Sequence, residues 1–211
     1  MWDSLIYYIT LACEALMGVF GARFYEEARY EVLARIDHRI EIRRYAPRLA
    51  AQIELPQADH RGRDEAFRTL FAYIAGANSA SDSMNARIAM TVPVAVEQPT
   101  RLPMTVPVLT SERGSGIRMQ FFLPAKYNLH MAPKPRDKRV TLVPIQSATV
   151  AILRFSGSGS DCFEKQTELI AKLEGSKWRP IEPPYALFYD APFTLPFLRR
   201  NEAAVTVAQI S

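Results

Sequence analysis

The feature that most constrains the fold is a strand–helix–strand–strand pattern that occurs twice along the chain. Each unit contains one helix with a single apolar stripe, and the two helices begin about a hundred residues apart. In the first helix the stripe consists of Phe67, Leu70, Phe71 and Ile74. Gly76 is the expected end of this helix, and the second helix is expected to begin with an Asp161–Glu164 capping box and to end at Gly175. Two apolar helix faces that each need a sheet to cover predict an α+β fold.

Strands are predicted where apolar residues alternate with polar ones or where short apolar runs lie between turns. They are expected at 36–45, 49–55, 87–96, 102–109 and 117–123 in the first half, and at 149–155, 185–190 and 203–210 in the second. In the 36–45 run, Ile40 and Ile42 occupy one face, while Arg39, Glu41 and Arg43 occupy the other, which predicts a half-buried strand. The predicted architecture is a distorted antiparallel β-barrel of duplicated β-α-β-β units flanked by two helices, with a further N-terminal helix.

The composition is that of a globular protein with a modest basic excess. Of 211 residues, 48% are hydrophobic and 23% are charged, and the formal net charge is +4. This excess favours an anionic partner, such as a carboxylate ligand, an acidic protein or an anionic lipid surface. The Lys and Arg residues are scattered, so no nucleic-acid partner is expected. Cys13 and Cys162 have no metal-site spacing, which indicates reduced thiols and a cytoplasmic protein.

Residues 1–25 are predicted to form an apolar or amphipathic helix separate from a folded domain at 26–211. The run from Leu5 to Phe20 is largely apolar but contains Glu14, and it is shorter than the ~20 apolar residues of a spanning helix. The basic residues that begin a secretory signal are missing. Three interpretations stay open: docking on the domain or on a protein partner, peripheral association with a membrane surface, and a membrane span.

Seven short motifs occur in the order typical of the SOUL/heme-binding protein family. They are Tyr30-Glu-Val-Leu33, Ile40-Glu-Ile-Arg-Arg-Tyr45, Tyr73-Ile-Ala-Gly-Ala-Asn78, Ile88-Ala-Met-Thr-Val-Pro-Val94, Leu153-Arg-Phe-Ser-Gly157, Tyr189-Asp-Ala-Pro192 and Leu195-Pro-Phe-Leu-Arg-Arg-Asn-Glu202. They extend from about residue 26 to the C-terminus. The MTVPV sequence, which recurs at 104–108, and the RRNE ending resemble the bacterial-type branch of the family. The chain thus resembles this family over nearly its whole length.

The resemblance implies a duplicated β-α-β-β fold, also seen in bacterial effector-binding domains, and non-covalent binding of heme or another porphyrin. The implied site is an apolar groove between the first helix and the loop before the last strand. The corresponding residues here are Phe67, Leu70, Phe71 and Ile74 on the helix, and Phe193, Leu195, Phe197, Arg199 and Arg200 in the loop. Met90 is added because its thioether is a soft contact for heme, although core packing is the alternative.

Two departures from the family pattern affect the implied site. Arg44 stands where one branch has a histidine proposed as iron ligand, and a guanidinium has no lone pair to offer. By strand parity Arg44 lies on the face of Ile40 and Ile42, so it is expected to need an anionic partner. A lysine that another branch is suggested to place against a heme propionate is also missing, since the sequence there is Thr194-Leu195.

Arg199 and Arg200 are expected to bind the propionates in place of that lysine, because guanidinium suits carboxylates. The alternative is that they are structural partners of Glu202 or Asp190.

No catalytic or metal site is predicted. The sequence has no GxSxG, HExxH, P-loop or Rossmann pattern, and its three histidines, His38, His60 and His130, are expected on the surface. The predicted function is therefore binding of a tetrapyrrole for buffering, carriage or sensing. The alternatives are an enzyme that acts on a tetrapyrrole or small amphiphile in the same groove, and an interaction protein that docks through residues 1–25.

Overall fold

The computed structural model describes residues 26–56, 59–79, 88, 91–97, 116–190 and 194–210. The helix predicted within residues 1–25 and the strand predicted at 102–109 lie outside the described residues, as do Met90 and Phe193. In the part of the chain that is described, no helix combines the length and apolar character needed to cross a membrane.

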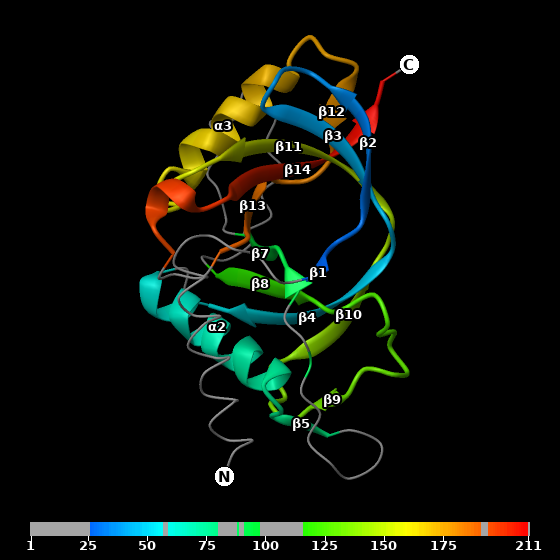
Figure 1. The fold of residues 1–211 in the computed structure, drawn as a ribbon, viewed down its shortest axis with the longest axis vertical. Helices are drawn as coiled ribbons and strands as arrows, with labels where there is room; N and C mark the ends of the chain where they lie inside the picture. The colour runs from blue at the N-terminus through cyan, green and yellow to red at the C-terminus, as the bar shows by residue number, and fades with distance from the viewer. Residues whose placement is uncertain are drawn as a thin grey trace, which may run out of the picture.

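Most of the described strands form one curled, antiparallel sheet of ten strands that resembles half of a barrel (Figure 1). Its order is β10 (Thr141–Ile145), β4 (Arg48–Leu55), β8 (Ile117–Phe122), β7 (Val94–Glu97), β13 (Tyr185–Phe188), β14 (Asn201–Gln209), β11 (Ala148–Phe155), β3 (Ile40–Tyr45) and β2 (Tyr30–Arg35), and β12 (Trp178–Pro180) pairs with β14. Two short pairs accompany it: β1 (Glu26–Glu27) with β6 (Thr91–Val92), and β5 (Asn78–Ser79) with β9 (Lys134–Pro135). The predicted α+β class is confirmed.

The predicted duplication is visible in the order of the strands. The first half contributes β4, α2 (His60–Ile74), β7 and β8, and the second contributes β11, α3 (Cys162–Leu173), β13 and β14. The halves meet where β7 pairs with β13. One further strand crosses from each half to the other. β3, from the first half of the chain, pairs with β11 of the second half, and β10, from the second half, pairs with β4 of the first. The strand β10 was not predicted from the sequence. Because only Ala46 and Pro47 separate β3 from β4, the chain passes directly from one half to the other at this bend.

The helix ends follow the sequence in part. The carboxylate of Asp59 accepts a hydrogen bond from Gly62 N at 2.9 Å and caps the start of α2. Gly76 adopts a φ of 116° just after α2, which confirms the predicted end, because glycine has no Cβ to oppose this conformation. The predicted capping box at α3 is wrong. Asp161 makes no side-chain bond to the helix start, and its Oδ1 instead accepts from the Ser160 hydroxyl at 2.8 Å.

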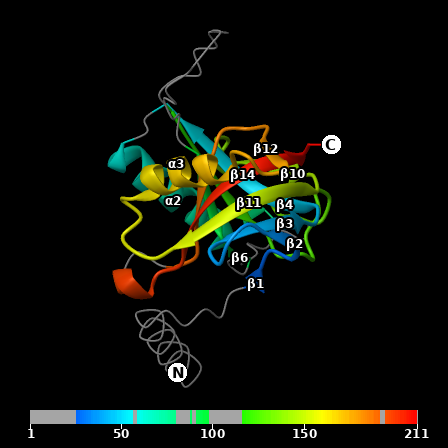
Figure 2. The ribbon, with the colours of Figure 1, turned by 90° about the horizontal axis from the view of Figure 1, so that it is seen from above.

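The helices cover the outer face of the curled sheet, with α2 on β4 and β8 and α3 on β11 and β14 (Figures 1 and 2). Each helix buries its apolar stripe in a core of its own: Leu70 and Ile74 lie in the first, and Leu169 and Leu173 in the second. A third cluster lines the inner face of the sheet. We call it the inner cluster, and it consists of Tyr45, Ala50, Ala95, Phe122, Val150, Ile152, Leu187, Tyr189 and Ala204.

The prediction that the strand at 36–45 is half buried is wrong. The strand begins only at Ile40, because the Asp37 carboxylate accepts hydrogen bonds from the backbone of Arg39 and Ile40 and forms a turn. The curl of the sheet encloses the face that was expected to meet solvent, since the side chain of Arg43 on that face is only 4% exposed. Arg44 is instead 55% exposed, and it has the expected anionic partner in Glu31 at 3.5 Å.

Candidate functional site

A buried carboxylate, Glu202, lies at the centre of the inner face and binds three side chains. Its side chain is completely inaccessible to solvent. Arg43 Nη1 donates to Oε2 at 3.0 Å, and Tyr189 Oη donates to the same oxygen at 2.6 Å. Arg200 donates to Oε1 through Nε at 3.0 Å and Nη2 at 2.8 Å. Charge-assisted bonds of this kind compensate the large desolvation penalty of a buried carboxylate.

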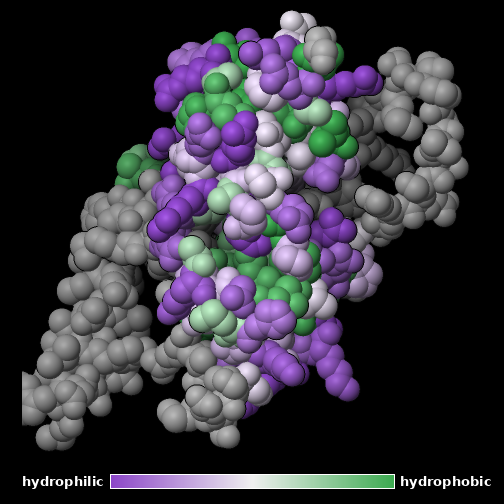
Figure 3. Space-filling view, turned by 90° about the vertical axis from the view of Figure 1, so that its right-hand side faces the viewer, coloured by the Kyte–Doolittle hydropathy of each residue, from purple (hydrophilic) through white to green (hydrophobic). Residues whose placement is uncertain are grey.

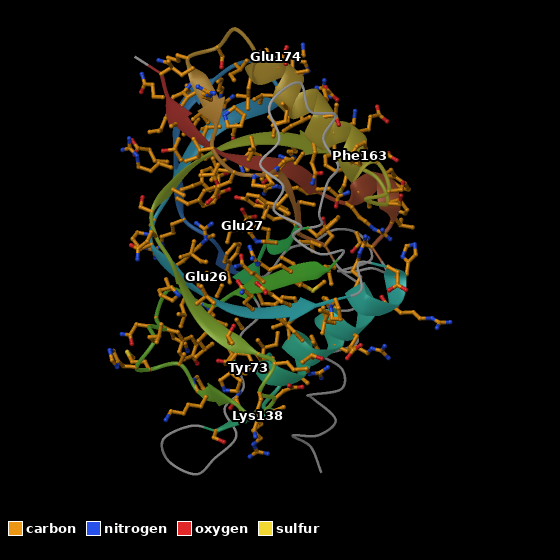
Figure 4. All side chains as sticks on the ribbon, turned by 180° about the vertical axis from the view of Figure 1, so that it is seen from behind. Glu26, Glu27, Tyr73, Lys138, Phe163 and Glu174 are labelled. Atoms are coloured by element: carbon orange, nitrogen blue, oxygen red, sulfur yellow. The ribbon has the colours of Figure 1, made fainter. Side chains whose placement is uncertain are left out.

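Aromatic rings and further carboxylates surround these groups. The Arg43 guanidinium lies 4.3 Å from the ring centre of Tyr30, and that of Arg200 lies 3.9 Å from the ring centre of Tyr189. Arg200 Nη1 also binds Glu27 at 3.2 Å, so the segment that contains β1 is attached to the inner face (Figure 4). We call Arg43, Tyr189, Arg200 and Glu202 the buried charge cluster.

The pKa values of Arg43, Arg200 and Tyr189 keep these three groups protonated, which is the form in which they donate to Glu202. Burial is the largest single influence and works to lower the pKa of Arg43 and of Arg200. The attraction of Glu202, together with neighbouring phenols and side-chain hydrogen bonds, nevertheless raises the pKa of both. Burial, reinforced by the negative charge of Glu202, raises the pKa of Tyr189 well above its usual range, so its phenol keeps the proton that it donates. Arg43 and Arg200 therefore keep their positive charge at any physiological pH, which suits a structural role.

Several of the family-type motifs contribute to this one place. Arg43 and Tyr45 come from the EIRRY motif, Tyr189 from YDAP, and Arg200 and Glu202 from RRNE. The contacts continue outward: Asp190 accepts from Arg200 N at 2.6 Å, and Asn201 Nδ2 donates to Gly157 O at 3.0 Å in the LRFSG motif. The motifs thus meet in space although they are far apart in the sequence.

The helix residues predicted to line a heme groove divide into two groups. Leu70 and Ile74 are buried in the core between α2 and the sheet. Phe67 is partly buried, and its ring contacts Phe121 with centroids 5.4 Å apart. Phe71 is 49% exposed and stacks on Phe67 at 6.1 Å. The exposed side of α2 therefore offers Phe71, while Leu70 and Ile74 belong to the scaffold.

The predicted loop residues lie around η1 (Pro196–Leu198), a 3-10 turn before β14. Leu195 is 36% exposed and Phe197 is 70% exposed. Arg199 Nε donates to Thr194 O at 2.7 Å, and Arg200 belongs to the buried charge cluster. The alternative interpretation of Arg200, as a structural partner of Glu202 and Asp190, is therefore what the structure contains.

The two predicted walls lie on one side of the molecule. The 3-10 turn, orange-red in Figure 1, and the start of α2 are both at its left edge, on the upper and lower halves respectively. Figure 2 shows that they are offset in depth. On the side where the sheet bends, hydrophilic residues divide the hydrophobic surface into patches (Figure 3).

A cavity that the sequence did not predict lies beside the C-terminal half of α2. It has a volume of about 440 Å³ and is open on one side. Its lining comprises Arg68, Thr69, Ala72, Tyr73, Ala77, Pro135, Arg136, Asp137 and Val140. The Tyr73 hydroxyl forms its inner limit by donating to Pro133 O at 2.8 Å, and burial raises the pKa of Tyr73 to about 12. Small residues at 72 and 77 were the signal in the sequence, since they leave room between α2 and the following segment.

Groups that would ligate iron are not gathered in the described structure. Across residues 26–56, 59–79, 88, 91–97, 116–190 and 194–210, no three His, Cys, Asp or Glu side chains form a group that could hold a metal ion. His38, His60 and His130 are all exposed, as expected.

The curled sheet, the two helices and the converging motifs define a domain of duplicated β-α-β-β units. A family model described as SOUL heme-binding protein matches residues 25–206. The chain therefore belongs to the SOUL heme-binding protein family, as its motifs predicted. No match was found among the curated proteins.

Solved structures share the fold at low sequence identity. The C-terminal domain of EcmrR is 8% identical with a TM-score of 0.58, over 86% of this chain and 99% of that chain. An uncharacterized conserved protein from Listeria innocua is 11% identical with a TM-score of 0.56, over 82% and 93% of the two chains. A hydrolase from Listeria innocua is 12% identical with a TM-score of 0.53, over 83% and 94%. Identities this low establish a common fold alone.

Proposed function

We propose that this protein binds heme or a related tetrapyrrole non-covalently, on the side of the molecule formed by α2 and η1. Membership of the SOUL heme-binding protein family is the observation that carries the proposal. The exposed Phe71 on α2 and the exposed Leu195 and Phe197 around η1 support the location, because large apolar side chains in contact with water can mark binding surfaces.

The residues on this side suit the two chemical parts of a heme. Its planar ring would be covered by Phe71 and Phe197, since aromatic faces stack favourably. Its propionates would stay at the edge near Arg199, whose guanidinium suits carboxylates. Arg200 is held by Glu202 and Glu27, so a propionate near it would have to compete with these carboxylates. When bound, the heme iron would supply oxygen and redox chemistry that this side of the protein does not itself supply.

Replacing Phe197 by Ala should weaken heme binding about tenfold or more. The ring is 70% exposed in the protein alone, and covering a phenylalanine ring contributes about 1.5–3 kcal/mol. The effect is measured by titrating each variant with heme and following the Soret absorbance. Ile181→Ala is the matched control, because Ile181 is 59% exposed but lies next to β12. Equal affinities of the two variants would remove η1 from the proposed site.

A further inference from the structure

Arg48, the first residue of β4, presents two guanidinium nitrogens that are enclosed and have no hydrogen-bond partner. These are Nε and Nη1, whereas the residue as a whole is only half buried. A guanidinium carries five N–H donors and cannot give up its charge, so enclosed donors without an acceptor destabilise the protein. The position of Arg48 therefore needs an explanation beyond packing.

Two aromatic rings of the inner cluster hold this guanidinium in place. Its carbon lies 4.6 Å from the ring centre of Tyr45 and 4.4 Å from that of Phe122. Such contacts stabilise a cation through the faces of the rings. The rings cover the faces of the guanidinium but accept none of the N–H groups at its edge, so Nε–H and Nη1–H still lack an acceptor. Arg48 is thus fixed in orientation but is not neutralised.

The described carboxylates of the inner face are engaged elsewhere. Glu202 binds Arg43 and Arg200, and Glu27 binds Arg200. The ionisable groups that interact with Arg48 are phenols rather than carboxylates, namely Tyr185, Tyr45 and Tyr189. Burial without a carboxylate partner lowers the pKa of Arg48, whereas the pKa of Arg43 and that of Arg200 are raised. Of the inner-face arginines described here, Arg48 is the cation that lacks an anion.

We propose that the inner face of the curled sheet binds a carboxylate attached to a planar apolar body, with Arg48 as its counter-ion. A guanidinium edge with several N–H donors matches the two oxygens of a carboxylate. The partly buried side chains that pack on the inner cluster beside it, namely Ile145, Ala148 and Tyr185, would cover the apolar body, and Ile145 is the direct partner of Arg48 in the pairing of β10 with β4. This site goes beyond the tetrapyrrole proposal, because it lies inside the curl rather than on the side of α2 and η1.

The test uses the 211-residue protein and 2-naphthoate, with its methyl ester as the uncharged probe. Calorimetric titration should show that wild type binds the acid, and that Arg48→Met weakens it at least about tenfold, because a charge-assisted bond is lost. The ester should bind weakly and equally to both proteins. Arg118→Met is the matched control, since Arg118 on the neighbouring β8 already has a carboxylate partner in Glu54 at 2.7 Å. It should bind the acid as wild type does.

Two further readouts keep the test decisive. Thermal unfolding of Arg48→Met without ligand should occur at the wild-type temperature or above it, since an uncompensated cation is removed; if this variant does not fold, Arg48→Gln replaces it. An arginine Nε–H signal in the ¹H–¹⁵N spectrum should shift with naphthoate in wild type and be missing in the variant. Absence of binding to wild type, equal affinity for acid and ester, or unchanged affinity of the Arg48 variant would each overturn the proposal.

Heme titration distinguishes this site from the proposed heme site on the side of α2 and η1. Arg48→Met should bind heme as wild type does. Loss of heme binding in this variant would contradict the existence of a second site.

Discussion

Glu202→Gln should lower the free energy of unfolding by about 3 kcal/mol or more. The substitution keeps the size of the side chain but removes the charge that neutralises Arg43 and Arg200 in the interior. Breaking a buried ion pair by removing one partner costs about 3–5 kcal/mol, because the other partner is left buried and uncompensated. Glu41 and Glu27 offset part of this, since they contact the same arginines. Denaturation by urea, followed by circular dichroism, measures the difference.

Glu54→Gln is the control for this experiment. Glu54 forms an ion pair with Arg118 at 2.7 Å on the same sheet, but its side chain is 58% exposed. Exposed pairs contribute about 0–1 kcal/mol, so the control should remain within about 1 kcal/mol of wild type. A Glu202 variant as stable as this control would mean that the buried charge cluster is not a support of the fold.

Leu70→Ala should destabilise the protein by about 2–5 kcal/mol, whereas Phe71→Ala should change its stability by about 1 kcal/mol or less. Leu70 is fully buried between α2 and the sheet, and truncating it leaves a cavity. Phe71, the next residue, is 49% exposed and loses mainly its stacking on Phe67. Unfolding of both variants, combined with heme titration, separates the two roles.

For heme affinity, we expect the two variants to rank in the opposite order, with the larger loss in Phe71→Ala. Phe71→Ala should reduce heme affinity while the fold stays intact. If Leu70→Ala instead left stability unchanged and weakened heme more than Phe71→Ala did, the stripe of α2 would face the ligand rather than the core.

The sequence was sufficient for the architecture, because periodicity reports which residues are covered. The spacing of Phe67, Leu70 and Ile74 predicted α2, and positive φ at Gly76 follows from its position after the stripe. The pairing of strands between the two halves could not be predicted from the sequence. β3 pairs with β11, which lies about a hundred residues later, and no local pattern encodes that contact.

Two predictions from periodicity were wrong for the same physical reason. Periodicity shows which residues share a face of a helix or strand, but it does not show whether other elements cover that face. Alternation along β3 predicted a solvent face for Arg43, although the curl of the sheet encloses that face. The stripe on α2 grouped Leu70 with Phe71, although one faces the core and the other faces water. Arg200, which directly precedes β14, and Glu202 were predictable as a pair, because residues two apart in extended backbone share a face.

We propose that an apolar surface with cationic edges, rather than a protein ligand to iron, holds the tetrapyrrole. Titration of the purified 211-residue protein with heme and with metal-free protoporphyrin, under identical conditions, tests this proposal. We expect saturable binding of both with affinities within about tenfold of each other, and a heme spectrum without the sharp bands of bis-histidine coordination. Binding that requires iron, with a bis-histidine spectrum abolished by a single His→Ala substitution, would contradict it.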